Sequence, residues 1–336
     1  MIAKDISFII PVFNRPDETK ELLESFVELE GLKDFEIIII EDGSTLKSEG
    51  IVKKYSDRLN ITYLFKRNTG PGDSRNFGMQ NASGSYFIIL DSDCILPKSY
   101  LIEVLHSLTV NYVDCFGGPD AAHNSFTSIQ KAINFAMTSF ISTGGIRGNK
   151  KSIDVFQPRS FNMGISKTAF EATKGFGNIH PGEDPDLSIR LTKLGYKTKL
   201  IEKAFVYHKR RVSWVKFYKQ VSKFGLVRPI LNVWHPETKK ITYWFPSVFC
   251  VGLLLALMLC VFSIYWLILF YAFYYVLALL LALIQTGSIF VAIMALYAIS
   301  IQFFGYGFGF LKSTLKLLGS ERDIEKRFPE LFFKLD

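Results

Sequence analysis

The run Glu36-Ile37-Ile38-Ile39-Ile40-Glu41-Asp42-Gly43-Ser44 decides the fold class of the first part of the chain. Four consecutive isoleucines without polar alternation indicate a strand covered on both faces, which is typical of a parallel sheet with crossover helices. The predicted strands span residues 6–12, 35–40, 61–65, 86–90 and 113–116. Helical stretches such as 17–30 and 97–110 lie between strands. The alternation predicts a doubly wound α/β domain.

Polar clusters follow three of the predicted strands. They are Pro11-Val12-Phe13-Asn14-Arg15, Glu41-Asp42-Gly43-Ser44 and Asp91-Ser92-Asp93. One Asp-Gly-Ser segment alone is ordinary turn chemistry. Ligands of doubly wound domains, however, bind outside the carboxyl ends of the strands. Three clusters at corresponding strand ends therefore predict a single binding site at that edge of the sheet.

The sequence also restricts how a nucleotide could be held. The loop after the first strand has no Gly-x-Gly-x-x-Gly fingerprint, and no Gly-x-x-x-x-Gly-Lys-Ser/Thr motif occurs anywhere in the chain. Two carboxylates spaced as in Asp91-Ser92-Asp93 can share a divalent cation such as Mg²⁺ or Mn²⁺, which then binds substrate phosphates. We therefore expect phosphates to be held through a metal.

Five motifs together resemble the family 2 glycosyltransferases of GT-A fold. The resemblance covers roughly residues 5–210, in the order and approximate spacing of that family, and includes an acceptor-side stretch from Asn162 to Gly177. The motifs are Pro11 to Arg15, Asp42-Gly43-Ser44, Asn68-Thr69-Gly70 with Ser74-Arg75-Asn76, Asp91-Ser92-Asp93, and Gly182 to Leu187. The fold that this implies is a Rossmann-like GT-A domain with a mostly parallel sheet.

The resemblance implies a donor site for a nucleoside-diphosphate sugar. Asp42 would contact the nucleobase, and Arg75 would lie near the nucleotide. The expected nucleotide-sugar-binding residues are Pro11, Val12, Asn14, Asp42, Arg75 and Asp91.

The resemblance also implies a metal site for Mn²⁺ or Mg²⁺. Asp91 and Asp93 would form its Asp-x-Asp motif, with Asp93 as the direct ligand. His208 follows the apolar run 204–207 and has two interpretations. It either completes the metal or diphosphate site, as a histidine near this position can in related enzymes, or it is a surface residue.

Asp184 is the residue that the resemblance implies as general base, with Glu183 beside it as the second catalytic candidate. A base that deprotonates the acceptor hydroxyl, opposite a leaving diphosphate, inverts the anomeric centre. Glu183 and Asp186 also suit an N-terminal capping role for the helix predicted at 185–194. His180 is expected to be a loop residue and not a ligand. No Gln-x-x-Arg-Trp motif follows the base, which favours a non-processive enzyme that transfers one sugar per encounter.

The second part of the chain predicts an integral membrane protein. Residues 241–311 contain no Asp, Glu, Lys, Arg or His over 71 positions, and one crossing needs only about 20 apolar residues. Three candidate spans lie at 244–262, 265–284 and 288–311. Three spans would place the tail outside, whereas its six basic and five acidic residues suit a cytoplasmic tail, so the number of crossings stays open. The first residues do not form a signal peptide, so we expect a cytoplasmic catalytic domain on an inner or plasma membrane.

Basic residues gather just before the apolar part. Residues 203–240 hold ten Lys or Arg and one acid, interleaved with aromatics, which favours a segment lying on an anionic membrane surface over nucleic-acid binding. The four cysteines show no disulfide or metal spacing and are expected to be buried thiols. The expected segments are a GT-A domain at 1–210, a basic amphipathic interfacial segment at 211–240, an all-α transmembrane region at 241–311 and a charged tail at 312–336.

The expected function is an inverting, metal-dependent glycosyltransferase. It would move a hexosyl or N-acetylhexosaminyl group from a nucleoside-diphosphate sugar to a hydroxyl of a membrane-associated, lipid-linked saccharide in cell-surface glycan synthesis. Two alternatives remain: a polyprenyl-phosphate glycosyltransferase that makes a lipid-linked sugar donor, and a membrane-anchored protein that only binds nucleotides or sugars. The identity of the sugar is not encoded in any motif, because donor selectivity depends on a few hydrogen bonds.

Overall fold

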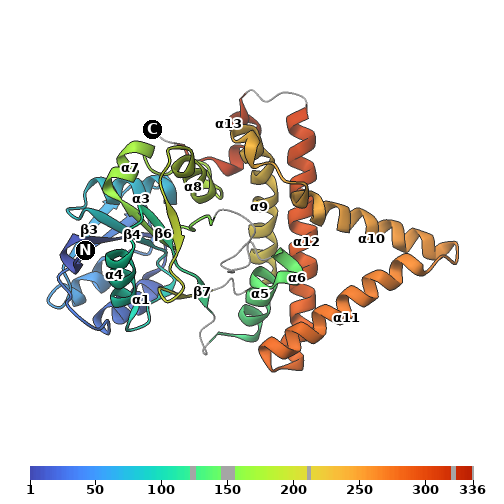
Figure 1. Cartoon of the computed structure of the whole chain (residues 1–336), viewed down its shortest axis with the longest axis horizontal. Helices are drawn as coiled ribbons and strands as arrows, with labels where there is room; N and C mark the ends of the chain where they lie inside the picture. Colours follow the sequence, from blue (N-terminus) through green and yellow to red (C-terminus); the bar gives the residue numbers. More distant parts are fainter. Residues whose placement is uncertain (122–125, 145–155, 210–212, 319–322, 335–336) are drawn as a thin grey trace. The chain divides into compact units, whose positions relative to one another are not determined.

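The computed structural model describes the chain as two compact units (Figure 1). Its described residues are 1–121, 126–144, 156–209, 213–318 and 323–334. Unit 1 holds residues 1–121, 156–209 and 332–334 of these, and unit 2 holds 126–144, 213–318 and 323–331. The units thus interleave along the chain, whereas the segments expected from the sequence are consecutive.

Unit 1 is built on a seven-stranded sheet with the order β3-β2-β1-β4-β8-β6-β9. All neighbouring strands are parallel except β8, which is antiparallel to both β4 and β6. The mostly parallel, Rossmann-like sheet is therefore confirmed. The strands are β1 Ile6–Val12, β2 Glu36–Asp42, β3 Ile61–Lys66, β4 Tyr86–Leu90, β6 Cys115–Gly117, β8 Asn162–Ser166 and β9 Thr198–Leu200.

Helices cover both faces of this sheet, as the uninterrupted isoleucines predict. Phe8 and Ile10 of β1 belong to one core with Phe26, whereas Ile9 between them belongs to a second core with Met79. Successive strand residues point to opposite faces, so both faces are buried. Figure 1 shows α1 and α4 on one side of the sheet and α3 and α7 on the other. The helices of this unit are α1 Pro16–Val27, α2 Glu49–Val52, α3 Pro71–Gln80, α4 Tyr100–Val110, α7 Lys167–Thr173 and α8 Glu183–Lys193, with 3₁₀ turns at Ala3–Asp5 and Lys53–Tyr55.

A second, three-stranded sheet lies at the carboxyl edge of the first. It has the order β5-β10-β7, and its strands are β5 Cys94–Ile95, β7 Asp120–Ala121 and β10 Val206–His208. β10 is antiparallel to β5, with His208 opposite Cys94. This pairing brings a histidine from far along the chain to the loop that carries Asp91 and Asp93.

Unit 2 is all α-helical. Its helices are α5 Ser128–Thr138, α6 Phe140–Thr143, α9 Trp214–Trp234, α10 Phe245–Val261, α11 Trp266–Thr286, α12 Ile289–Leu318 and α13 Ile324–Arg327, with 3₁₀ turns at Pro236–Thr238, Ile241–Trp244 and Pro329–Leu331. Three helical segments, Ile241–Val261, Trp266–Thr286 and Ile289–Leu318, are long and apolar enough to cross a membrane. The three expected apolar segments are therefore present as helices. α12 runs past the expected end at residue 311, because the lysines that follow are good helix formers and no proline stops it.

Glycines allow α9 and α12 to pack closely. A Cβ atom on Gly225 would lie 2.2 Å from the Tyr306 carbonyl oxygen, and one on Gly309 would lie 2.4 Å from the Ser222 carbonyl oxygen. Gly305, four residues before Gly309, faces α9 in the same way. Small residues at this spacing let two helix backbones approach one another, so these glycines permit the close crossing of α9 and α12.

The basic segment before the apolar part forms α9. Several of its apolar side chains, including Phe217, Val221 and Ile230, are buried, while Val215, Lys216 and Lys219 are exposed. This helix therefore contributes a core face to unit 2, which the sequence did not suggest. Its placement on a membrane surface stays a prediction, and residues 210–212 lie outside the described residues. The four cysteines are unpaired, and all except the half-buried Cys260 are buried.

Candidate active site

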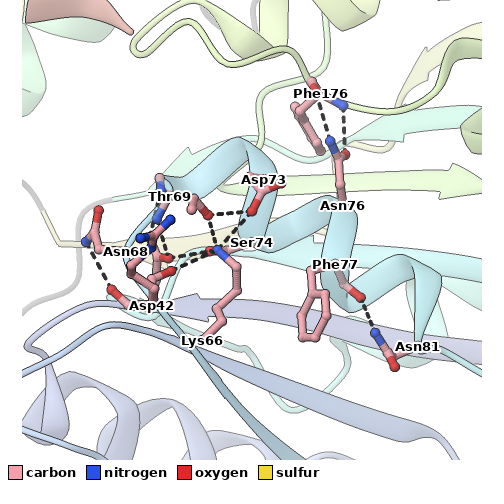
Figure 2. A network of polar contacts seen from close by, with 12 residues as sticks. Asp42, Lys66, Asn68, Thr69, Asp73, Ser74, Asn76, Phe77, Asn81 and Phe176 are labelled. Atoms are coloured by element: carbon pink, nitrogen blue, oxygen red, sulfur yellow. Dashed lines mark hydrogen bonds and ion pairs between the residues drawn. The ribbon is translucent and has the colours of Figure 1, made fainter. Parts of the chain in front are cut away.

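Asp42 ends β2 and holds the loop that follows β3 (Figure 2). Its Oδ1 accepts hydrogen bonds from the Thr69 amide and from Lys66 Nζ, both at 3.0 Å, and its Oδ2 accepts one from the Gly70 amide at 3.0 Å. Asn68 Nδ2 donates to the Asp42 backbone carbonyl. A carboxylate offers about four acceptor positions, of which these contacts use three. Asp42 is thus fixed in place and retains capacity for one further donor.

Lys66 is a site residue that the sequence reasoning missed. Its Nζ lies 3.0 Å from Asp42 Oδ1 at the end of β2 and 2.9 Å from Asp73 Oδ2 in the first turn of α3, so it neutralises both carboxylates (Figure 2). The parallel register of β2 and β3 places Lys66 directly opposite Asp42. Only that register, and no local motif, could have identified the lysine.

The loop after β1 has a supporting role in which Asn14 is central. Asn14 Oδ1 accepts hydrogen bonds from the backbone amides of Thr45 and Leu46 at 2.9 Å. The backbone amide of Asn14 donates to Ser44 Oγ at 2.7 Å. Asn14 has a φ of 54°, a conformation that asparagine tolerates better than most residues. Of the other two residues expected here, Pro11 is half-buried within β1 and Val12 is buried in the core. Asn14 therefore ties the loops after β1 and β2 together.

Asp91, Asp93 and His208, the three expected metal ligands, lie close together. His208 Nε2 lies 3.1 Å from Asp93 Oδ1 and 3.9 Å from Asp91 Oδ2. The imidazole stacks on Phe161, with 4.9 Å between ring centroids. Arg15 Nη1 lies 2.9 Å from the other oxygen of Asp93. Of the two interpretations of His208, the structure therefore favours the one that places it with the carboxylates.

These side chains suit a Mn²⁺ or Mg²⁺ ion. Carboxylate oxygens are the preferred ligands of both ions, and imidazole nitrogen is acceptable to Mn²⁺. Among the described residues His208 Nδ1 is buried without a hydrogen-bond partner, which leaves Nε2 as the ring nitrogen directed at the carboxylates. Cys94 also lies within the cluster, but burial raises the pKa of its thiol well above the ordinary value. Cys94 is therefore a neutral side chain and a poor ligand for a hard cation.

Arg75 connects the loop with Asp91 and Asp93, called the metal loop for its expected role, to residues 174–184, called the base loop because they include the expected base Asp184. Arg75 is 3% exposed, and its guanidinium donates to Asp91 Oδ1 at 2.8 Å and to Glu183 Oε1 at 3.1 Å. It lies over the ring of Phe176, 5.3 Å from the centroid. The next residue, Asn76, exchanges two hydrogen bonds of 2.8 Å with the Phe176 backbone (Figure 2). One turn of α3 thus fixes both the arginine and the loop that it contacts.

Glu183 is a buried, ionised carboxylate. Besides Arg75, its Oε1 contacts His180 Nδ1 at 2.9 Å. Burial acts to raise the pKa of Glu183, but the charges and hydrogen bonds of His180 and Arg75 outweigh it and lower the pKa to about 2. His180 is the loop residue that we expected, and the structure adds that it positions Glu183.

The prediction that Glu183 or Asp186 caps α8 is wrong. The N-cap residue is Gly182, and it has no side-chain capping hydrogen bond. Glu183 instead contacts Arg75, and Asp186 Oδ2 accepts a 2.9 Å hydrogen bond from Arg190 Nε. Both acids lie in the first turn, where negative charge favours the helix, but ion pairing with arginines determines where their carboxylates point.

Asp184 differs from its neighbour in its electrostatics. Burial and the adjacent Glu183 charge raise the pKa of Asp184, and the guanidinium of Arg159, 3.8 Å away, opposes them only in part. Two neighbouring carboxylates whose pKa values are pushed apart are typical of an acid–base site. Arg159 belongs to no motif, so no local pattern identifies it as a site residue.

Comparisons with known proteins agree with this geometry. The family model described as Glycosyl transferase family 2 matches residues 7–173. An uncharacterized glycosyltransferase of Rickettsia felis is 42% identical over 93 residues, which are 28% of this chain and 15% of that protein. The poly(ribitol-phosphate) beta-N-acetylglucosaminyltransferase TarS of Staphylococcus aureus is 34% identical over 111 residues, which are 32% of this chain and 19% of that protein. The chain thus spans less than a fifth of the length of these curated relatives.

A solved structure extends the agreement in fold to almost the whole chain. The mannosyltransferase PcManGT from Pyrobaculum calidifontis, in complex with GDP-Man and Mn²⁺, has a TM-score of 0.57 and 15% sequence identity. The alignment covers 94% of this chain and 87% of that one. Fold, motifs and family match together show that residues 7–173 form a glycosyltransferase family 2 domain of GT-A fold, in a chain that also has C-terminal apolar helices.

Proposed function

We propose that the chain transfers one sugar, with inversion, from a nucleoside-diphosphate sugar to a hydroxyl of a membrane-associated acceptor, with a divalent metal as cofactor. One observation carries this proposal. Arg75 bridges Asp91 of the metal loop and Glu183 of the base loop, so the groups for the leaving phosphates and for the acceptor lie in one network.

The donor end of the site suits a nucleotide. The remaining acceptor position on Asp42 can take an N–H of a nucleobase, which is a donor group. Asp93, Asp91 and His208 would hold Mn²⁺ or Mg²⁺, which stabilises the charge that develops on the departing diphosphate. The relatives support an N-acetylhexosaminyl or hexosyl donor, because TarS is an N-acetylglucosaminyltransferase and PcManGT was solved with GDP-Man.

At the other end of the site Asp184 acts as the general base. It takes the proton of the acceptor hydroxyl while that oxygen attacks the anomeric carbon. The bond from that carbon to the diphosphate oxygen breaks on the opposite face, so the configuration inverts. The raised pKa of Asp184 strengthens it as a base relative to an ordinary aspartate, and Glu183 remains ionised beside it.

The apolar helices point to an acceptor at a membrane. Three helices of unit 2 are long and apolar enough to span a bilayer, and TarS is named for a polymer, poly(ribitol-phosphate). We therefore propose a lipid-linked saccharide of cell-surface glycan synthesis as acceptor. In this proposal unit 1 lies on the cytoplasmic side of an inner or plasma membrane.

The test uses the full-length protein in detergent with a panel of UDP- and GDP-sugars and Mn²⁺. Release of nucleoside diphosphate and transfer to a lipid-linked saccharide are expected, and the anomeric configuration of the product is read by NMR. A protein that consumes no nucleotide sugar contradicts the proposal. A product formed only on polyprenyl phosphate would instead identify an enzyme that makes a lipid-linked sugar donor.

Metal dependence has its own controls. Excess EDTA and Asp93→Ala should each abolish turnover, whereas Cys94→Ser should keep metal-dependent activity, because the neutral thiol is not a ligand. Full activity in EDTA would contradict the metal site. Equal losses in the Asp93 and Cys94 variants would show that we have assigned the ligands wrongly.

A further inference from the structure

The last described residues of the chain belong to the catalytic unit and not to the helical one. After α13 and the turn Pro329–Leu331, Phe332 forms an antiparallel bridge with Ile179, and the Phe333 amide donates to the Asn178 carbonyl at 3.3 Å. The partners of this segment lie in the loop just before His180 and Glu183. The C-terminal segment, residues 332–334, is thus attached to the base loop by its backbone.

The ring of Phe333 lies against the loop that follows β3, residues 67–70, called the donor loop because its amides hold Asp42. A Cβ atom on Gly70 would be 2.3 Å from Phe333 Cδ2 and 2.5 Å from Cγ, so the ring occupies the space that a side chain at Gly70 would need. Gly70 has a φ of 96°, which strains any other residue, and its amide donates to Asp42 Oδ2. Glycine at this position thus admits the aromatic ring and leaves the loop without a side chain of its own to pack.

The same ring also reaches the base loop. Its centroid lies 6.0 Å from that of His180, whose Nδ1 contacts Glu183 Oε1. Phe333 therefore touches one residue that orders Asp42 and one that orders Glu183. These two residues belong to opposite ends of the proposed site.

We propose that Phe333 is a positioning residue for the nucleotide-sugar site. Its ring packs on the donor loop, so that the Thr69 and Gly70 amides stay on the Asp42 carboxylate while Asp42 presents its remaining acceptor position to the nucleobase. The nucleotide part of this inference rests on the proposed function. Phe333 lies 160 residues beyond the end of the family match at residue 173, so the chain completes its donor site with a segment outside the family domain.

Hydrogen exchange tests the positioning role without any ligand. In full-length protein, Phe333→Ala should speed exchange of the peptide that contains the Thr69 and Gly70 amides by about tenfold, the size of effect expected when a side chain acts on a site through its neighbours. Phe333→Leu, which keeps an apolar side chain, should restore much of the protection. Lys334→Ala, at the exposed next residue, should change nothing. Unchanged exchange in Phe333→Ala overturns the proposal.

Nucleotide titration tests the consequence for the site. With Mn²⁺ present, Phe333→Ala should weaken the binding of UDP or GDP, whichever the wild type binds, by about tenfold. The KM for the matching nucleotide sugar should rise similarly, with kcat at saturation nearly unchanged. Tighter binding in Phe333→Ala would mean that the ring blocks the site and would overturn the proposal. If wild type binds neither nucleotide while the exchange difference persists, the proposed function fails but the positioning role stands.

Discussion

Two adjacent carboxylates, Glu183 and Asp184, show how neighbouring residues of one type acquire different properties. Glu183 faces Arg75 and His180 and has a lowered pKa, whereas burial and the charge of Glu183 raise the pKa of Asp184. The difference arises from partners that are distant in the sequence, since Arg75 lies 108 positions before Glu183. Chemistry at this site thus depends on the environment of each carboxylate and not on its residue type.

Asp184→Asn should lower kcat by about two to four orders of magnitude, the usual contribution of a positioned general base. Nucleotide binding should stay close to that of wild type, because Asp42 and the metal ligands are unchanged. The measurement is steady-state kinetics of nucleotide-sugar consumption, with Asp57→Asn at an exposed position as the matched control. A large loss of donor affinity with an unchanged rate at saturation would exclude Asp184 as the base.

The pH dependence follows from the raised pKa of Asp184. The base must be deprotonated, so kcat should fall as pH decreases through a pKa above the ordinary aspartate value of 3.8. A group whose pKa is raised on folding favours the folded state at low pH and loses that contribution as pH rises through the folded pKa. Asp184→Asn should therefore keep or raise the Tm at pH 7, with the difference disappearing near pH 4. A large drop in Tm at pH 7 would show that the ion pair with Arg159 outweighs burial.

At the scale of elements, short strands and close helix contacts assemble the molecule. β10 has only three residues, yet its pairing with β5 places His208 beside Asp93. In unit 2 the crossing of α9 and α12 depends on glycines, because the backbones approach too closely for side chains. Both cases link residues that are far apart along the chain through backbone geometry.

Gly309→Ala should destabilise unit 2 by about 1 to 3 kcal/mol, the usual cost of overpacking. The added methyl group would lie 2.4 Å from the Ser222 carbonyl oxygen of α9, so one of the two helices must shift. Thermal unfolding in detergent measures the effect, and Phe308→Ala, at an exposed position on the same helix, is the control. Equal stability of the Gly309 variant and wild type would mean that α9 and α12 do not pack this closely.

At the scale of the whole molecule, an α/β unit and an apolar helical unit alternate along one chain. Residues 126–144 lie between two parts of unit 1 in the sequence but belong to unit 2. Residues 332–334 follow unit 2 in the sequence but belong to unit 1. The chain therefore passes between the two units several times. This links the functions that we propose for the two units, catalysis and membrane attachment. Deleting either unit as a linear segment would remove part of the other.

Anionic lipid should support activity through the exposed lysines of α9. In vesicles with anionic lipid, Lys216→Gln with Lys219→Gln should raise the KM for a lipid-linked acceptor, because each basic residue near such a surface contributes about 1 kcal/mol. The difference should vanish in zwitterionic vesicles and in 1 M salt, where the Debye length is about 3 Å. Lys53→Gln with Lys54→Gln, at exposed positions of unit 1, is the matched control. The same KM for both double variants in anionic vesicles would contradict a membrane role for α9.

Local pattern alone was enough to predict much of this protein. β1 and β4 have the predicted bounds, because an unbroken apolar run bounded by polar residues specifies a buried strand. The apolar helices follow equally directly, since 71 residues without charge have few other folds available. The Asp-x-Asp and Glu-Asp motifs were also recognisable, because each is contiguous in the chain.

Other features were decided only by tertiary structure. The partners of the site carboxylates, Lys66, Arg159 and His180, became visible only once strand register and loop packing were known. β8 escaped prediction because its five residues include glycine and asparagine, and they form a strand only between β4 and β6. Phe333 is the extreme case, since its contact with Gly70 joins residues 263 positions apart. The physical reason is common to all of them: a local pattern encodes which face of an element is buried, whereas the residue that fills the space opposite is selected when distant segments pack.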